Sequence, residues 1–167
     1  MTAHTGTEED THEETVDGVP LGFGGVEADV GDHIAHFFRG GQRRFSVLGP
    51  YVEAGLRRGD RCVFISQPDV GAALCEWLAE RGVDAAEARS ADRLILDPGR
   101  DTEDDMKRLA DRIDASVQET NESFVRWAGD GEWCLDRDIT VEEMLRWEAL
   151  YDEHASEWQL LALCQFD

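Results

Sequence analysis

Short apolar runs alternate with amphipathic stretches along this chain from about residue 32 to residue 167. The apolar runs lack the strict polar alternation of strands that keep one face in water, which is typical of strands buried on both faces. The expected strands cover residues 33–38, 61–66, 93–97, 123–128 and 160–166. The stretches between them place apolar residues at helical spacing, and the expected helices cover about 42–58, 70–78, 102–117 and 140–158. This alternation predicts an α/β fold with a mostly parallel central sheet flanked by helices.

Local signals mark several helix ends. Gly59 is expected to end the first helix, because glycine readily takes the left-handed conformation found at helix C-termini. Asp69 is expected to be the N-cap of the second helix. Thr140 and Glu143 have the spacing of a capping box, in which each side chain accepts a hydrogen bond from the backbone N–H of the other residue. These signals support the helical assignment of the amphipathic stretches.

The first strand-to-helix connection lies where a nucleotide-binding α/β protein carries its phosphate loop. Residues 38–44 read FRGGQRR. The pattern G-x-x-x-x-G-K-[ST] is absent, so the connection lacks the lysine and the hydroxyl that hold phosphates and Mg²⁺. A strand–turn–helix layout without these groups favours a sensor or binding module over an enzyme.

Acidic residues dominate the charge of the chain. Asp and Glu number 37, the formal net charge is -21, and Lys107 is the single lysine. Such a charge repels itself at low ionic strength, whereas molar salt shortens the Debye length to about 3 Å. We expect a protein from a salt-accumulating halophile. The acidic surface argues against direct nucleic-acid binding, which needs basic side chains.

The first 31 residues differ in composition from the rest. They contain no lysine or arginine and are rich in acidic residues, threonine and glycine. Such a segment buries too little apolar surface to offset the entropy lost on ordering. We expect residues 1–31 to form a disordered acidic leader and residues 32–167 to form one domain.

The chain has no signal-peptide apolar region and no long apolar run. We therefore expect a cytoplasmic protein that does not bind membranes. The four cysteines form no C-x-x-C pair: Cys62, Cys75, Cys134 and Cys164. A reducing compartment then favours reduced thiols over disulfides.

Six segments, taken in order, resemble one known family. They are HIAHFF (33–38), PYVEAGL (50–56), GDRCVFI (59–65), RLILD (93–97), VRWAGDGEW (125–133) and LCQFD (163–167). The family is the MEDS domain, a methanogen/methylotroph sensory domain, and the resemblance covers about residue 32 to residue 167. It implies a RecA/KaiC-like α/β fold without a working phosphate loop and a role in sensing small, hydrocarbon-like molecules. Members occur alone or joined to DNA-binding or kinase modules, and this chain resembles a stand-alone member.

The opening motif of that family is commonly His-x-Cys-x-Phe-Tyr. His33 matches the histidine, but Ala35 stands where the cysteine is usual and Phe38 where the tyrosine is usual. Residues 33 and 35 of a strand point to the same face, so the alanine removes half of any chelate formed there. His33 and His36 point to opposite faces and are not expected to bind one metal together. We therefore expect no metal and no cofactor.

Ligands of open α/β sheets bind beyond the carboxyl ends of the strands. Applied to the expected strands, this rule and the two histidines give the expected ligand-binding residues: His33, His36, Phe38, Gln67, Asp97, Glu132 and Trp133. Phe38 and Trp133 are expected to form an apolar wall. One polar contact, from a histidine or Glu132, is expected to orient the ligand. No catalytic residue is expected.

These observations favour a non-enzymatic small-molecule sensory or signalling domain, active in transcriptional regulation. Its signal is expected to pass through a regulatory protein partner or through self-association, because the sequence shows no helix-turn-helix or kinase segment. Two alternatives remain. One is a protein-interaction scaffold without a ligand, and the other is a degenerate RecA-like ATPase that uses Glu132 on a bound water.

Overall fold

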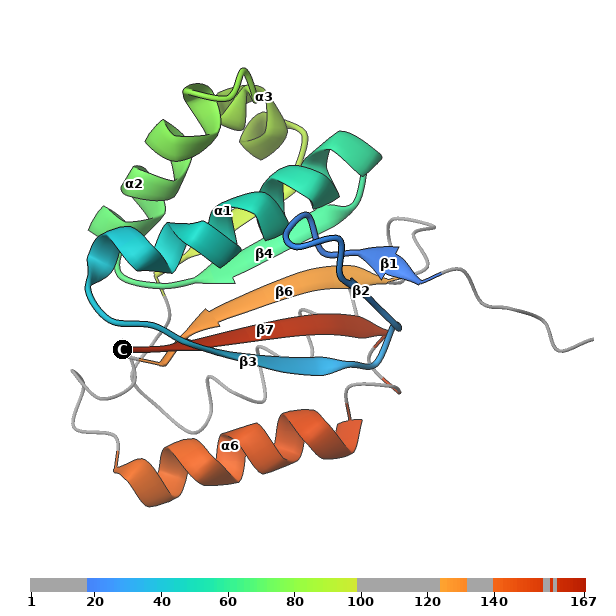
Figure 1. Ribbon diagram of the computed structural model, residues 1–167, viewed down its shortest axis with the longest axis vertical. Helices are drawn as coiled ribbons and strands as arrows, with labels where there is room; N and C mark the ends of the chain where they lie inside the picture. The colour runs from blue at the N-terminus through green and yellow to red at the C-terminus, as the bar shows by residue number, and fades with distance from the viewer. Residues whose placement is uncertain (1–17, 99–123, 132–139, 155–156, 158) are drawn as a thin grey trace, which may run out of the picture.

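The structure is a computed structural model that describes residues 18–98, 124–131, 140–154, 157 and 159–167. Five strands form one sheet in which all neighbours are parallel, in the order β3-β7-β6-β4-β5 (Figure 1). They are β3 (His33–Phe37), β4 (Arg61–Ile65), β5 (Leu94–Asp97), β6 (Val125–Asp130) and β7 (Leu160–Phe166). The predicted parallel α/β fold is confirmed, with small differences at the strand ends. Because the strands are parallel, their carboxyl ends share one edge of the sheet.

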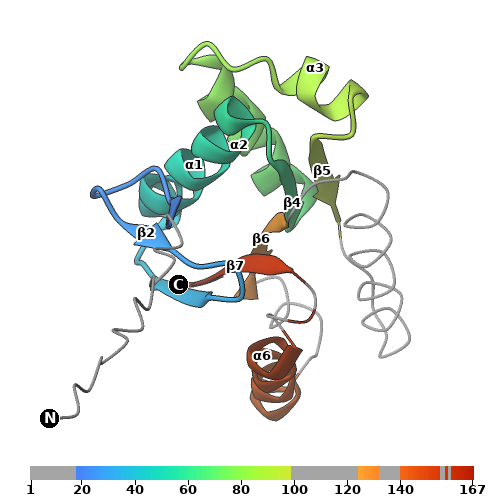
Figure 2. The same cartoon turned by 90° about the vertical axis from the view of Figure 1, so that its right-hand side faces the viewer.

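Helices cover both faces of this sheet. Figures 1 and 2 show α1, α2 and α3 on one face and α6 on the other. Their bounds are α1 (Gly41–Arg58), α2 (Pro68–Ala79), α3 (Ala85–Ser90) and α6 (Val141–His154). Phe64 and Leu161 belong to the core on the α1 side, whereas Trp127 and Tyr151 belong to the core on the α6 side. The strands are therefore buried on both faces, which explains their continuous apolar runs.

Two helix ends on the α1 side test the sequence signals. Gly59 ends α1 with a φ of 98°, as predicted. The N-cap of α2 is Gln67, so the prediction of Asp69 is wrong. Pro68 takes the first helical position, where its missing N–H leaves no hydrogen bond unmade, and the helix therefore begins before Asp69.

Two further helix starts involve side-chain caps. The capping box of α6 is confirmed: the Thr140 N–H donates to Glu143 Oε2 at 2.8 Å, and the Glu143 N–H donates to Thr140 Oγ1 at 3.2 Å. Helix α3 was not predicted, and the Asp84 carboxylate caps it by accepting from the Glu87 N–H at 2.8 Å. The helix expected at 102–117 lies outside the described residues. In the described part of the chain, no helix is long and apolar enough to cross a membrane.

Part of the expected leader belongs to the fold. β1 (Val19–Pro20) pairs antiparallel with β2 (Glu27–Ala28). Leu21 is 2% exposed and joins the core on the α1 side. The prediction of disorder is therefore wrong for residues 18–31, because the acidic average hides a few apolar side chains that fit the core. Residues 1–17 lie outside the described residues.

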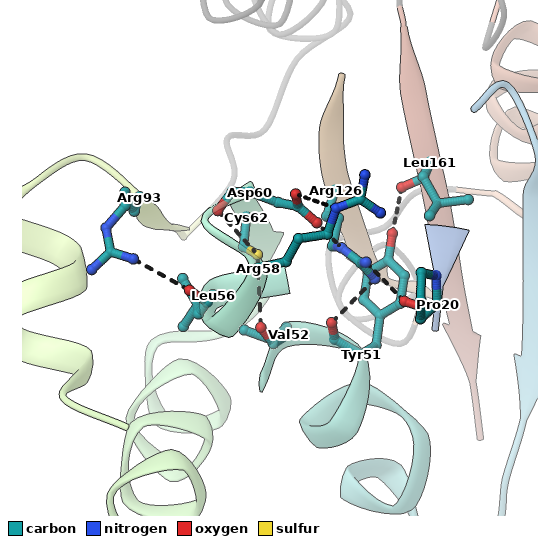
Figure 3. Close-up of polar contacts among 10 residues, drawn as sticks. All are labelled: Pro20, Tyr51, Val52, Leu56, Arg58, Asp60, Cys62, Arg93, Arg126 and Leu161. Atoms are coloured by element: carbon teal, nitrogen blue, oxygen red, sulfur yellow. Dashed lines mark hydrogen bonds and ion pairs between the residues drawn. The ribbon is translucent and has the colours of Figure 1, made fainter. Parts of the chain in front are cut away.

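A buried arginine joins these N-terminal strands to the sheet (Figure 3). Arg126 of β6 donates from Nη2 to the Pro20 carbonyl oxygen at 2.8 Å and from Nε to Asp60 Oδ2 at 2.7 Å. Its guanidinium also lies 5.1 Å from the ring centroid of Tyr51, and burial raises the pKa of that tyrosine well above 10.0. One side chain thus connects β1, the start of β4 and α1.

Candidate ligand-binding site

Strand β3 presents its two histidines to opposite faces of the sheet. His36 lies on the α1 side, where its Nδ1 is 3.0 Å from Nε2 of Gln165. His33 lies on the α6 side, where its Nε2 is 3.1 Å from Oε2 of Glu148 and 3.2 Å from Sγ of Cys164. This arrangement follows from the alternation of side chains along a strand. The two histidines belong to separate groups of residues.

The carboxyl ends of β3, β6 and β7 and the first turn of α1 bring five side chains together on the α1 side. We call this set the strand-end cluster: His36, Phe38, Arg44, Asp130 and Gln165. Arg44 Nη1 donates to Asp130 Oδ2 at 2.6 Å, and the two side chains are only 5% and 2% exposed. The guanidinium lies 5.1 Å from the ring centroid of Phe38, and that ring lies 5.5 Å from the ring of His36. A buried ion pair of this kind holds its side chains in fixed positions through charge-assisted hydrogen bonding.

Gln165 has a side-chain amide oxygen that can accept a further hydrogen bond. Its Nε2 is 3.0 Å from His36 Nδ1 and 3.2 Å from the Arg44 carbonyl oxygen, so the two amide hydrogens each have an acceptor. Burial lowers the pKa of His36 below 6.5, which favours the neutral ring that this hydrogen bond needs. The buried Oε1 of Gln165 has no hydrogen-bond partner among the described residues. A buried acceptor of this kind is completed by a donor from a ligand or from water.

The N-terminus of α1 carries a carboxylate in the position where a phosphate loop would hold phosphate. The Gly40 N–H points at Asp167, with distances of 3.1 and 3.3 Å to the two carboxylate oxygens. Helix N-termini attract anions through their N–H groups and dipole. Here the protein's own side chain supplies the anion, and it would repel a phosphate group.

The other expected site residues lie elsewhere. Gln67 and Asp97 follow or end β4 and β5, and β6 and β7 separate those strands from β3. At about 4.8 Å per strand, Gln67 and Asp97 are roughly 14 and 19 Å across the sheet from β3. They are therefore far from His36 and Phe38, although β4 is the direct neighbour of β6, which carries Asp130 of the strand-end cluster. Glu132 and Trp133 lie outside the described residues, and their part in a pocket stays a prediction.

Three members of the cluster were not identified from the sequence: Arg44, Asp130 and Gln165. Gln165 carried a usable signal, because it is a polar residue near the carboxyl end of an apolar strand. Asp130 follows Gly129 at the end of β6, where the strand-end rule also applies. Arg44 had no such signal, since its partner is far away in the sequence.

Residues 32–167 match the family model described as MEDS, the methanogen/methylotroph, DcmR sensory domain. The chain belongs to the MEDS family. This match covers the whole sheet and all five members of the strand-end cluster.

One curated relative and one solved structure are similar to this MEDS domain. It is 24% identical over 144 residues to the transcriptional repressor DcmR of Methylorubrum extorquens, covering 86% of this chain and 54% of the repressor. The chain therefore spans about half the length of this curated relative. It is also similar to the crystal structure of a KaiC-like protein from Pyrococcus horikoshii, with a TM-score of 0.66 and 15% identity over 89% of this chain and 71% of the other. The second likeness concerns the fold alone.

Proposed function

We propose that this MEDS domain is a non-enzymatic sensor of a small organic molecule and acts in transcriptional regulation through a protein partner or through self-association. Membership of a sensory-domain family is the observation that carries the proposal. Its similarity to half of a transcriptional repressor supports the regulatory part. The expected location of such a regulator is the cytoplasm.

The strand-end cluster supports a ligand of mixed character. Phe38 supplies a buried aromatic ring, 8% exposed, and the Oε1 of Gln165 is a buried acceptor without a partner among the described residues. A small organic molecule with an apolar body and one hydrogen-bond donor fits both groups. Burial of its apolar part contributes about 25 cal/mol per Å² removed from water.

The same edge of the sheet is poorly suited to a nucleotide. The Asp167 carboxylate occupies the N-terminus of α1, and Arg44, a cation near it, is already bonded to Asp130. A phosphate group would have to displace one carboxylate or break a buried ion pair. These contacts support the sensor over the ATPase alternative.

A thermal-shift screen in molar KCl tests the proposal. Dichloromethane and short alcohols are compared with ATP plus Mg²⁺ and with buffer alone. A ligand at about a hundred times its dissociation constant should raise the melting temperature by roughly 5 °C or more. Stabilisation by ATP with Mg²⁺ would favour the ATPase, and no stabilisation by any compound would favour the ligand-free scaffold.

Matched glutamine variants locate the binding site. Gln165→Leu removes the buried acceptor of the strand-end cluster, whereas Gln67→Leu makes the same change at the end of β4. Each shift is measured from the variant's own melting temperature, so a change in basal stability cancels. We expect the ligand-induced shift to be lost in Gln165→Leu and kept in Gln67→Leu. The opposite pattern would move the site to β4.

A further inference from the structure

Three potential metal ligands converge on the opposite face of the sheet, below β3 and β7. They are His33 of β3, Glu148 of α6 and Cys164 of β7, and we call them the metal triad. One ligand atom from each residue lies within 4.8 Å of the other two. We propose that the metal triad binds one Zn²⁺ ion, which ties α6 to the edge of the sheet.

The contacts of His33 point to an ion at this place. Its Nε2 lies 3.1 Å from Glu148 Oε2 and 3.2 Å from Cys164 Sγ. A ring nitrogen carries at most one proton, so it can donate one full-strength hydrogen bond, to the carboxylate or to the sulfur. A cation among the three atoms uses the lone pairs of all of them at once.

The distances and the atom types fit zinc. Zinc bonds of about 2.0–2.3 Å to nitrogen, oxygen and sulfur put the ligand atoms of a tetrahedral site roughly 3.3–3.8 Å apart. Two of the separations in the metal triad, 3.1 and 3.2 Å, fall just below this range, and the third is no more than 4.8 Å. A set of imidazole, thiolate and carboxylate is one that zinc accepts.

Burial and charge favour occupancy. Cys164 is 5% exposed, and the side chains of His33 and Glu148 are 11% and 26% exposed. A thiolate and a carboxylate with a neutral imidazole carry two negative charges, which one divalent cation neutralises. Because cysteine binds zinc as the thiolate, Zn²⁺ binding releases the proton of the Cys164 thiol to solvent.

Strand register explains why the Cys164 thiol was not predicted from the sequence to lie beside His33. Cys164 is the residue opposite Ala35 in the β3–β7 pair. Because residue 35 is an alanine, β3 alone cannot supply both a histidine and a thiol to one metal ion. The neighbouring strand offers a sulfur on the same face, so the proposal of a zinc site departs from the expectation of no metal.

The described residues supply three ligands, which leaves the fourth tetrahedral position for water or a small donor. Closed structural zinc sites have four protein ligands, whereas sites that exchange a ligand have three. The proposed site is therefore of the open kind. This inference does not depend on the ligand proposed for the strand-end cluster, which lies on the other face.

Metal titration of the full chain tests the inference. The protein is freed of metal with a chelator and titrated in molar KCl with Zn²⁺, and separately with Co²⁺. We expect one equivalent bound per chain and, with Co²⁺, a near-ultraviolet band from thiolate-to-metal charge transfer. Binding of many equivalents without that band would show weak binding by surface carboxylates and would overturn the proposal. Absence of binding would overturn it as well.

Matched variants assign the ligands. Cys164→Ser and His33→Gln should each weaken Zn²⁺ binding by at least the roughly 10–100-fold that is lost when an outer-shell partner of a metal ligand is changed. Cys62→Ser changes a buried thiol of β4, and His36→Gln changes the histidine on the other face of β3, so both should bind as the unchanged chain does. If Cys164→Ser fails to fold, Glu148→Gln and its control Glu153→Gln on α6 give the same comparison. An unchanged charge-transfer band in Cys164→Ser, or unchanged Zn²⁺ affinity in Glu148→Gln, would contradict the assignment.

Discussion

At the scale of single residues, the buried charges matter most for stability. The Arg126 side chain is 0% exposed, and its Nε pairs with Asp60 Oδ2 at 2.7 Å. Removing one partner of a buried pair leaves the other charge in a medium of low polarity, which costs about 3–5 kcal/mol. We expect Asp60→Ala to lower the free energy of unfolding by about 3 kcal/mol, measured by urea denaturation.

A surface pair provides the control for this prediction. Arg146 and Glu142 are also 2.7 Å apart, but their side chains are 72% and 77% exposed. Exposed pairs contribute about 0–1 kcal/mol, so Arg146→Ala should change the free energy of unfolding by less than about 0.5 kcal/mol. If Asp60→Ala and Arg146→Ala lower the free energy of unfolding equally, the burial of Arg126 does not determine how much stability is lost when its ion pair is broken.

His36 links the strand-end cluster to pH. Burial lowers the pKa of this histidine below 6.5, so between the two pKa values the unfolded chain binds more protons than the folded one. Its contribution to stability is therefore complete above pH 6.5 and is lost as the pH falls through the folded pKa. Protonation of Nδ1 would also set two donors against each other at Gln165.

The corresponding measurement compares two chains. The free energy of unfolding should fall more between pH 7.5 and pH 5.5 in the unchanged protein than in His36→Gln. These two pH values lie on either side of the ordinary histidine pKa of 6.5. Other groups titrate equally in both chains and cancel in the difference. Parallel pH curves would mean that His36 keeps its ordinary pKa in the fold.

At the scale of elements, α1 and α2 pack closely at one glycine. A Cβ on Gly49 would lie 2.5 Å from the ring of Trp77. Alanine normally stabilises a helix interior by about 1 kcal/mol relative to glycine, but overpacking costs about 1–3 kcal/mol. When Trp77 is present, we expect Gly49→Ala to lower the free energy of unfolding by about 1 kcal/mol.

The aromatic partner decides the sign of that effect. In a Trp77→Ala background the clash is gone, and Gly49→Ala should become stabilising by about 1 kcal/mol. Four urea denaturation curves complete this double-mutant cycle. The same effect of Gly49→Ala in both backgrounds would contradict the close packing of the two helices.

The elements also show what a sequence can and cannot predict. The five strands of the parallel sheet, the end of α1 at Gly59 and the capping box at Thr140 follow from local patterns, because periodicity and caps act within a few residues, whereas β1 and β2 were missed. The start of α2 at Pro68 was missed, since two local signals competed there. The pairing of Ala35 with Cys164 could not be predicted, because strand register depends on residues far apart in the sequence.

The site follows the same division. The opposite orientations of His33 and His36 come from alternation along one strand, which is local. The Arg44–Asp130 ion pair and the contact of His33 with Glu148 join segments that are distant in the sequence. Composition and residue spacing therefore do not predict them. The strand-end rule selects the edge of the sheet where Phe38 lies, but which other residues lie near it depends on which strands are neighbours.

At the scale of the whole molecule, charge repulsion is the dominant feature. With a net charge of -21, the fold should gain stability as salt screens the acidic residues. We expect the melting temperature to rise between low salt and molar KCl. A flat or falling curve would contradict the expectation of a halophilic protein.

A variant with fewer exposed acids isolates the electrostatic part. Glu76, Asp152 and Glu153 are exposed, and changing them to the corresponding amides removes three negative charges. The melting temperature of this variant should depend less steeply on KCl than that of the unchanged chain. Equal slopes would assign the salt effect to stronger apolar burial.

We propose that the strand-end cluster binds a small organic molecule in place of a nucleotide. Backbone and side-chain amide NMR spectra test it most directly, with the labelled chain titrated by the best compound of the thermal-shift screen and separately by ATP with Mg²⁺. We expect saturable shifts for the Phe38 amide and the Gln165 side-chain amide with the organic compound, and none with the nucleotide. Saturable shifts at Gly40 and Gly41 with ATP and Mg²⁺, or no saturable shift at Phe38 and Gln165 with the organic compound, would contradict it.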